Sequence, residues 1–476
     1  MSSFFQRLTS LDRAFLDIES GPLHMHVGAV AVFDGRGLVA PDGALDAVTL
    51  RQHISASLER IPRFRQRVHA VPLLGTAWLD DPDFRIDYHV RHTSVPRPGT
   101  RAQLDALAGR LFSQRLDRER PLWEMWLVEG LEDGRFAIVT KAHHAMLDGV
   151  EGIGVLGALF SFSPGELGRD GPRDRVRPPH RGALARALFA QRLDELPVLG
   201  ARLRDLARPE ARERVRSALR GAVHMVVDVT AKTPPTPLNP ERIGPHRAFG
   251  GRRISLESLK STRRAAGTTL NDVVLAVVAG ALRRHLLRRG TPIDGLVLRA
   301  LVPVNLRTRE SDSARQRTGN HVSMLVVPLP VGEADPQARL RFVHEHARAL
   351  KEGSNEVEAG QLVEEIGDLG PEGLVGLVFA LALRMLPFHV IVTNVPGPPV
   401  PLYLGPSKLE ALYPLVPLFA RQSVGVALLS YDGGLFVGIN ADLDRVPDLE
   451  ALLDDVAASE RELREALGGR RDTDRG

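Results

Sequence analysis

The chain lacks cysteine in all of its 476 residues. This absence excludes disulfide bonds, thiolate nucleophiles and cysteine-ligated metal ions or clusters, and with them several classes of enzyme. The chain also lacks an excess of one charge, because 62 lysine and arginine residues face 58 aspartate and glutamate residues for a net charge of +4. A net charge this small in a chain this long argues against a nucleic acid partner.

Long apolar runs are absent too. No segment reaches the roughly 18 uninterrupted apolar residues that span a bilayer. The nearest run, from Gly373 to Leu383, is closed by Arg384 and Pro387 and is typical of a buried helix. Residues 1–8 show no basic region followed by a long apolar run, so no secretory signal is indicated and we expect a cytoplasmic protein.

Helical and strand patterns alternate along the chain, which predicts a mixed α/β protein. Because 476 residues exceed one comfortable core, we expect two domains, over residues 1–165 and 246–476, joined by a connector over 166–245. Periodicity and turn signals predict helices over 50–61, 100–116, 152–162 and 268–289, and strands over 135–142, 296–304, 322–328, 388–393, 423–430 and 435–441.

The connector is basic and interrupted by proline. Residues 181–220 hold ten arginines against five acidic residues, with leucines at helical spacing. A basic amphipathic helix can lie on an anionic membrane, but docking on its own protein is the more common use. A proline-rich passage from Thr233 to Pro240 then leads to the second domain. Peripheral contact with a membrane therefore stays open.

The most informative pattern is His-His-Ala-Met-Leu-Asp-Gly at residues 143–149. It follows an apolar strand, and Gly149 supplies turn freedom, so His144 is expected where the strand becomes a loop. An imidazole with a pKa near 6.5 can take a proton from a hydroxyl group at neutral pH. Asp148 either accepts a hydrogen bond from the ring or pairs with a distant arginine, and we favour the arginine. A lone buried histidine is ordinarily structural, but the fixed offsets of this motif favour catalysis.

Other patterns carry less weight. Residues 152–157 match G-x-G-x-x-G, but a dinucleotide fingerprint follows directly from a strand, so we favour small residues packing a helix on a sheet. His344-Glu345-His346 lacks the spacing of a zinc motif and predicts a solvated helix face. No G-x-S-x-G segment offers the usual site for a serine acyl-enzyme, so direct transfer is the simpler mechanism.

Residues 120–131, which include Pro121-Leu122-Trp123, and the histidine turn together resemble the bacterial wax ester synthase/acyl-CoA:diacylglycerol acyltransferase family. The likeness extends over nearly the whole chain apart from the connector. Its further motifs are Leu11-Asp12-Arg13-Ala14-Phe15-Leu16, Met25-His26-Val27-Gly28, Asn271-Asp272-Val273-Val274-Leu275-Ala276, Gly319-Asn320 and Asn394-Val395-Pro396-Gly397-Pro398. The histidine motif alone is shared with other CoA-dependent acyltransferases, including condensation domains.

The resemblance implies two similar domains of chloramphenicol-acetyltransferase type, joined by the helical, proline-rich connector, with a tunnel at their interface and the histidine at its midpoint. It implies that His144 deprotonates the alcohol, which attacks the thioester of a long-chain acyl-CoA directly. Acyl-CoA and either diacylglycerol or a long-chain alcohol would be substrates, with triacylglycerol or wax ester as product. No metal or prosthetic group is implied.

The resemblance also suggests roles for individual residues. The catalytic set is His144, His143, Asp148 and Gly149, with His143 chiefly shaping the pocket. Pro121, Leu122 and Trp123 are expected to form the strand entry and the substrate-binding wall. Asn271 is expected either to bind substrate or to cap a helix, and Asn394 either to bind substrate or to form a turn.

Two alternatives to this activity remain. The first is a condensation-type or polyketide-tailoring acyltransferase that takes its acyl group from a carrier domain, although the chain contains no carrier domain. The second is a relative that binds lipid without turnover. The choice of acceptor, the chain length and the oligomeric state are not encoded in these patterns. Lipid acceptors would place the protein at the inner membrane or at lipid droplets at least part of the time.

Overall fold

The computed structural model describes residues 5–71, 75–147, 149–168, 234–305, 322–352 and 388–468, with single positions between 182 and 193. These residues form two compact units. The first contains the described residues up to 193 together with residues 400–412, and the second contains residues 234–352, 388–399 and 413–468. Most of the predicted connector and the apolar run from Gly373 to Leu383 lie outside the described residues, so the predicted domain limits remain a prediction.

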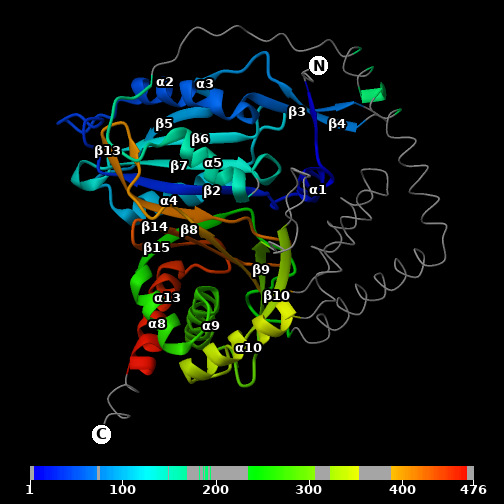
Figure 1. Cartoon of the computed structure of the whole chain (residues 1–476), viewed down its shortest axis with the longest axis vertical. Helices are drawn as coiled ribbons and strands as arrows, with labels where there is room; N and C mark the ends of the chain where they lie inside the picture. The colour runs from blue at the N-terminus through cyan, green and yellow to red at the C-terminus, as the bar shows by residue number, and fades with distance from the viewer. Residues whose placement is uncertain are drawn as a thin grey trace, which may run out of the picture. The chain divides into compact units, whose positions relative to one another are not determined.

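The first unit is built on a sheet of strand order β12-β13-β2-β7-β6-β5 (Figure 1). These strands are β12 (Tyr403–Leu404), β13 (Ser407–Leu415), β2 (His26–Phe33), β7 (Phe136–His143), β6 (Trp123–Glu129) and β5 (Val90–Ser94). A smaller sheet consists of β1 (Gln6–Arg7), β4 (Gly75–Asp80) and β3 (Gln66–Val71). Helices are α1 (Ser10–Ile18), α2 (Ala47–Ser57), α3 (Ile86–His89), α4 (Arg101–Ser113) and α5 (Gly149–Leu159), with short 3₁₀ turns η1 (Leu58–Arg60), η2 (Pro62–Arg65), η3 (Glu132–Gly134) and η4 (His144–Met146).

Strands β2 and β7 lie at the middle of this sheet and pair antiparallel, with His26 opposite His143. Both strands are rich in small and branched apolar residues, which suits a sheet covered on both faces. At Gly28 a Cβ atom would lie 2.0 Å from the carbonyl oxygen of Thr140, so only glycine fits this close approach. The strand that leads to the histidine turn is therefore held at the centre of the unit.

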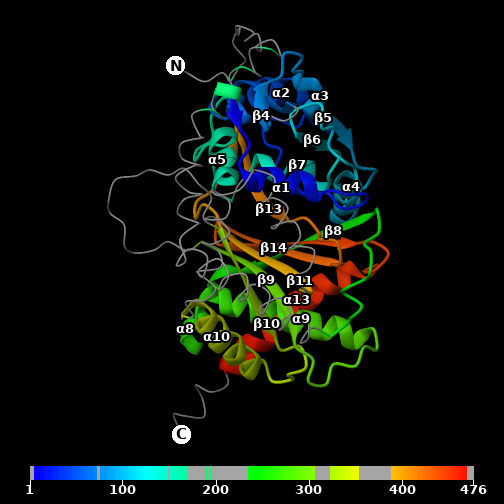
Figure 2. The same ribbon diagram turned by 90° about the vertical axis from the view of Figure 1, so that its right-hand side faces the viewer.

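The second unit has a sheet of order β10-β9-β11-β14-β15-β8. Its strands are β10 (Val322–Leu329), β9 (Leu298–Asn305), β11 (Val390–Pro396), β14 (Val424–Tyr431), β15 (Gly434–Asp442) and β8 (Arg247–Ser255). The helices α8 (Leu256–Ala266), α9 (Leu270–Arg288), α10 (Pro336–Glu352) and α13 (Leu449–Gly468) form a layer on one face of this sheet, as Figure 2 shows. Helix α9 is the centre of the core, because most of its side chains are buried and it contacts the other three helices.

Local sequence accounts for much of this architecture. The β14–β15 hairpin turns at Asp432 (φ 41°) and Gly433 (φ 75°), and two residues in the left-handed region form a tight turn, for which an Asp-Gly pair is well suited. Helix α9 begins after Thr269 and ends before Gly290, one or two residues inside the predicted range. Helix α5 begins and ends three residues earlier than predicted, directly behind the histidine turn.

Two further segments, the glycine-rich helix α5 and the apolar helices, bear on the predictions. The glycines of the G-x-G-x-x-G pattern lie inside α5, and a Cβ atom on Gly154 or Gly157 would meet nothing within 4 Å. The prediction that these two glycines pack the helix on the sheet is therefore wrong. Among the described helices none is by itself long and apolar enough to cross a membrane, and α8 and α9 pass such a test only as a pair bent by 105°.

Candidate active site

The histidine turn lies where β7 ends and η4 begins. The backbone N–H of His143 donates to the carbonyl oxygen of Leu122 at 2.9 Å, and that of His144 donates to the carbonyl oxygen of Met25 at 2.8 Å. The turn is thus attached to two other segments of the unit by main-chain hydrogen bonds. The positions of both imidazole rings follow from the sheet and not from a free loop.

The two histidines have different surroundings. The His143 side chain is 1% exposed, and its Nδ1 accepts a hydrogen bond from the backbone N–H of Ala145 at 3.0 Å. Its Nε2 lies 3.3 Å from Oε1 of Glu19. Because Nδ1 is an acceptor, the neutral ring carries its hydrogen on Nε2, where the carboxylate faces it. Neither nitrogen is therefore available as a base, which supports the interpretation of His143 as a residue that shapes the site.

Glu19 links three segments around this ring. Its Oε1 also accepts the backbone N–H of Met25 at 2.8 Å, and its Oε2 pairs with Arg118 at 2.8 Å. Burial would raise the pKa of Glu19, but His143, Arg118 and the Met25 N–H together hold that pKa well below its ordinary value. Sequence reasoning missed Glu19, because nothing local marks it and its partners are about a hundred residues away.

His144 is only half-buried, and its ring stacks on Phe15 of α1. The ring centroids are 4.1 Å apart and the planes are inclined by 29°. Helix α1 is fixed at its start by a capping box between Thr9 and Asp12. The stack fixes the plane of the imidazole in a residue that is not fully buried, and a general base must be reachable by the proton that it removes.

Leu122 and Trp123 are each 1% exposed, and Pro121 is buried beside them. The Trp123 indole N–H donates to the carbonyl oxygen of Phe64 at 2.7 Å, and its ring stacks on His89 with centroids 4.6 Å apart. These contacts attach the segment to the core next to the His143 strand. The role of the three residues in substrate binding stays a prediction.

A buried cation lies on the same face of the sheet as His143. The Lys141 side chain is 1% exposed, and its Nζ donates to the carbonyl oxygens of Leu111 and Gln114 at 3.0 and 2.9 Å and contacts Glu124 at 3.3 Å. Burial and the nearby charge of Lys141 lower the pKa of His26, which therefore stays neutral at physiological pH. The interior behind the turn thus holds a buried cation with three oxygen partners beside a neutral His26.

The predicted residues of the second unit are at the start of α9 and on β11. Thr269 caps α9 in a reciprocal box with Asp272, so Asn271 is not the cap. Among the residues that the structure describes, the half-buried side chains of Asn271 and Asn394 have no hydrogen-bond partner. The capping alternative for Asn271 is therefore wrong, and so is the turn alternative for Asn394, which lies inside strand β11. The role of both amides in substrate binding stays a prediction.

The remaining predicted positions are on or near the histidine turn and in the second unit. Asp148 lies outside the described residues, and so do Gly319 and Asn320. Gly149 is the first residue of α5. His344, which was predicted on a solvated face, instead places Nδ1 2.7 Å from Oδ2 of the buried Asp272, whereas His346 is exposed as predicted.

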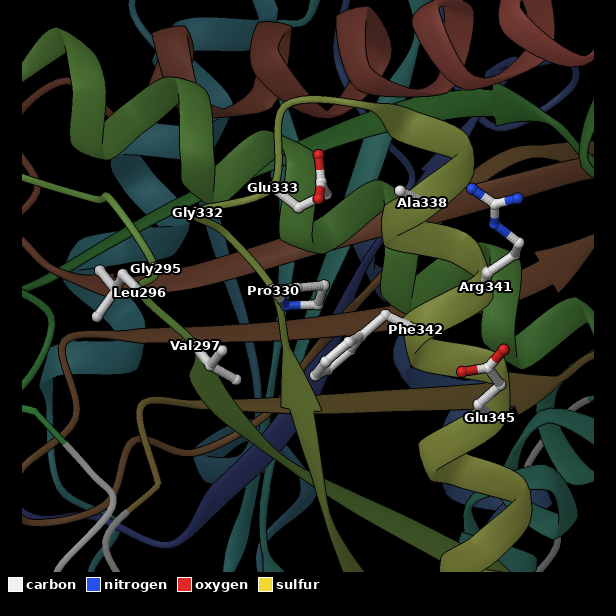
Figure 3. Close-up of a pocket in the computed structure, with 10 residues that line it drawn as sticks. All are labelled: Gly295, Leu296, Val297, Pro330, Gly332, Glu333, Ala338, Arg341, Phe342 and Glu345. Atoms are coloured by element: carbon white, nitrogen blue, oxygen red, sulfur yellow. The ribbon is translucent and has the colours of Figure 1, made fainter.

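A groove of about 530 Å³ occupies another part of the second unit (Figure 3). The ring of Phe342 points toward Pro330 and Val297, while Arg341 and Glu345 extend from α10. None of the site residues predicted from the sequence lines it. The groove is therefore not part of the candidate active site.

The two mixed sheets with their helical layers and the histidine turn define the two-domain acyltransferase fold. A solved trichothecene 15-O-acetyltransferase from Fusarium sporotrichioides, 12% identical, superposes with a TM-score of 0.61 over 98% of this chain and 97% of its own, a likeness that concerns the fold alone. The wax ester synthase/diacylglycerol acyltransferase of Marinobacter aquaeolei VT8 is 27% identical, with a TM-score of 0.68 over 97% of this chain and all of its own.

Sequence comparison then defines the family. The model of the wax ester synthase/diacylglycerol acyltransferase catalytic domain matches residues 8–274, and that of the C-terminal domain matches residues 318–464. A Mycobacterium tuberculosis protein named as a probable diacylglycerol O-acyltransferase, tgs2, is 33% identical over 466 residues, which are 96% of this chain and 98% of that one. The chain belongs to the wax ester synthase/diacylglycerol acyltransferase family and is an acyltransferase.

Proposed function

We propose that the protein transfers a long-chain acyl group from acyl-CoA to the hydroxyl group of diacylglycerol or a long-chain alcohol, with His144 as general base. His144 takes the hydroxyl proton while the oxygen attacks the thioester carbonyl. The tetrahedral intermediate then expels the CoA thiolate, which recovers the proton from the imidazolium. The products are an ester and free CoA, and the chain needs no covalent intermediate.

The observation that carries this proposal is the contrast between the two adjacent histidines. His143 is buried, accepts a hydrogen bond at Nδ1 and places Nε2 3.3 Å from the Glu19 carboxylate, whereas His144 is half-buried and held in its plane by Phe15. A general base must reach the proton that it removes, so accessibility decides between them. The acceptors are those in the names of the family and of the mycobacterial relatives.

The decisive experiment measures thiol release from palmitoyl-CoA with hexadecanol, with dipalmitoylglycerol and without acceptor, and separates the lipid products. We expect acceptor-dependent release by the wild type and a loss of about a thousandfold in His144→Ala, within the range ascribed to a general base. Arg341→Ala in the unrelated groove of Figure 3 is the control and should keep full activity.

Other outcomes would change the proposal. Ester formation only from an acyl carrier protein would favour a condensation-type donor, and lipid binding without any ester would favour a non-catalytic relative. Wild-type activity in His144→Ala would refute the general-base role of that residue.

We also infer peripheral contact with a membrane or lipid droplet, since both acceptors reside there. In the first unit, the helical positions Phe189 and Leu193 are 53% and 48% exposed, while Leu188 beside them is buried. Both are therefore large apolar side chains open to solvent. Flotation with anionic vesicles should fall in Phe189→Ser/Leu193→Ser, and unchanged flotation would remove this segment from membrane contact.

A further inference from the structure

His344 of α10 lies against the first turn of α9. Its Nδ1 is 2.7 Å from Oδ2 of Asp272, and the side chains are 32% and 2% exposed. The same carboxylate oxygen accepts the backbone N–H of Thr269 at 2.9 Å. The backbone N–H of Asp272 in turn donates to the Thr269 hydroxyl at 3.2 Å. Two helices are thus joined at one buried carboxylate.

A buried carboxylate is stable only when hydrogen bonds replace its lost hydration. The helix cap supplies one neutral donor, and His344 supplies the other from a different element. Because Asp272 is the acceptor, Nδ1 of His344 carries the hydrogen. Without that hydrogen, the carboxylate would retain only the bond of its own helix cap.

Asn271 lies inside this turn, between the two residues of the capping box. The backbone around it is fixed by the box and by His344, while its side-chain amide has no hydrogen-bond partner in the described part of the chain. A fixed backbone with an available amide is the arrangement expected of a residue that orients a bound molecule.

We propose that His344 is a positioning residue that acts through Asp272 to hold the Asn271–Asp272 turn for catalysis. The kinetic part of this inference rests on the proposed acyl transfer. The structural part, that His344 orders the start of α9, does not depend on it. Two experiments separate the parts.

The first experiment measures hydrogen–deuterium exchange at the start of α9 in the full-length protein. We expect His344→Phe, which fills the space without a donor, to speed exchange of the Asp272 and Val273 amides about tenfold, in line with the loss of a hydrogen bond to a charged group. His344→Asn places an amide donor near the position of Nδ1 and should restore most of the protection.

The matched control is His346→Phe. His346 lies two residues further along α10, is exposed, stacks on Phe342 and places Nδ1 2.8 Å from the carbonyl oxygen of that residue, within its own helix. Its replacement should leave exchange at α9 unchanged. Equal effects of the two phenylalanine variants, or unchanged exchange in His344→Phe, would overturn the structural part whether or not the protein makes ester.

The second experiment is a double-mutant cycle between His344→Phe and Asn271→Ala. If His344 acts through the turn, the double variant should have the kcat of Asn271→Ala alone, because the positioned amide is already gone. His344→Asn should recover most of the wild-type kcat. If the losses of kcat in the two single variants multiply in the double variant, His344 has only a structural role. If the wild type makes no ester, the proposed function is refuted, while the exchange result remains valid.

Discussion

The two adjacent histidines of the turn have different roles because different groups surround them. His143 and His144 are consecutive, yet one points to a buried carboxylate and the other stacks on an aromatic ring. Glu19 contributes to the difference, since its carboxylate faces Nε2 of His143 while the Ala145 N–H occupies Nδ1. Removing its charge should therefore affect catalysis without removing the base itself.

We predict that Glu19→Gln lowers kcat about 10- to 100-fold, by analogy with residues that orient the histidine ligands of metal sites. The amide keeps the shape but places a neutral group beside Arg118 and His143. The KM for acyl-CoA should change little. Steady-state kinetics with palmitoyl-CoA tests this, with Asp17→Asn on the exposed side of α1 as the control. Full activity of Glu19→Gln would show that the Glu19 charge does not matter to the turn.

Local sequence predicts some of the residues of the site but not those whose partners are distant in the chain. The strand before His143, the turn and the accessible His144 follow from local pattern, because each depends on neighbours within a few residues. Glu19 and His344 do not, because their partners Arg118, His143 and Asp272 are brought near only by folding. His344 was assigned to a solvated face for the same reason.

At the scale of elements, α4 is held to the central sheet by a buried ion. Lys141 of β7 donates to carbonyl groups at the C-terminal end of α4, where a helix accumulates partial negative charge. Glu124 of β6 completes the contact and also pairs with Arg91 of β5 at 3.2 Å. Lys141 and Glu124 together thus connect α4 with strands β7, β6 and β5.

We predict that Lys141→Met destabilises the protein by about 3–5 kcal/mol, because it leaves the buried Glu124 charge with less compensation. Burial lowers the pKa of Lys141, but its three acceptors favour the charged form. Urea unfolding measures the loss, with Lys260→Met on the exposed face of α8 as control. The double variant Lys141→Met/Glu124→Gln should recover part of the stability, and no recovery would show that charge is not the cause.

In helix α5 we predict substitutions that increase the stability of the protein. Gly154 and Gly157 lie within it, face open space and do not have a positive φ. Alanine at each position should raise the free energy of unfolding by roughly 0.5–1 kcal/mol, because glycine costs backbone entropy in a helix. Thermal unfolding of each variant tests this. A loss of activity without a loss of stability would instead reveal that the open glycine face contacts substrate.

At the scale of the whole molecule, burial of neutral histidines links stability to acid. His389 is fully buried, accepts the backbone N–H of Arg299 and donates to the carbonyl oxygen of Pro234, and burial lowers its pKa to about 4. In the unfolded chain the His389 imidazole has its ordinary pKa of 6.5 and takes up a proton near that pH. In the folded protein the same ring is protonated only near pH 4. The folded state therefore loses stability as the pH falls through this window.

From pH 7 to pH 5 we predict that His389 alone accounts for a loss of about 2 kcal/mol. Urea midpoints measured across this range should fall less steeply in His389→Gln than in the wild type, because the variant cannot take up the proton. His346→Gln, at an exposed site, should retain the wild-type slope. An unchanged slope in His389→Gln would assign the acid sensitivity to other groups.

The return of residues 400–412 to the first sheet has a consequence for how the protein is made. Strand β13 lies beside β2 in that sheet, although β2 and β7 are complete by residue 143 and β13 starts at residue 407. At about 5–20 residues per second, a ribosome needs roughly 13–50 seconds to make the intervening chain. During that time β2 is an open edge that invites mispairing. The segment matched as the catalytic domain, residues 8–274, is for the same reason not a complete folding unit, and nascent chains at this stage are natural clients for chaperones that shield unpaired strands.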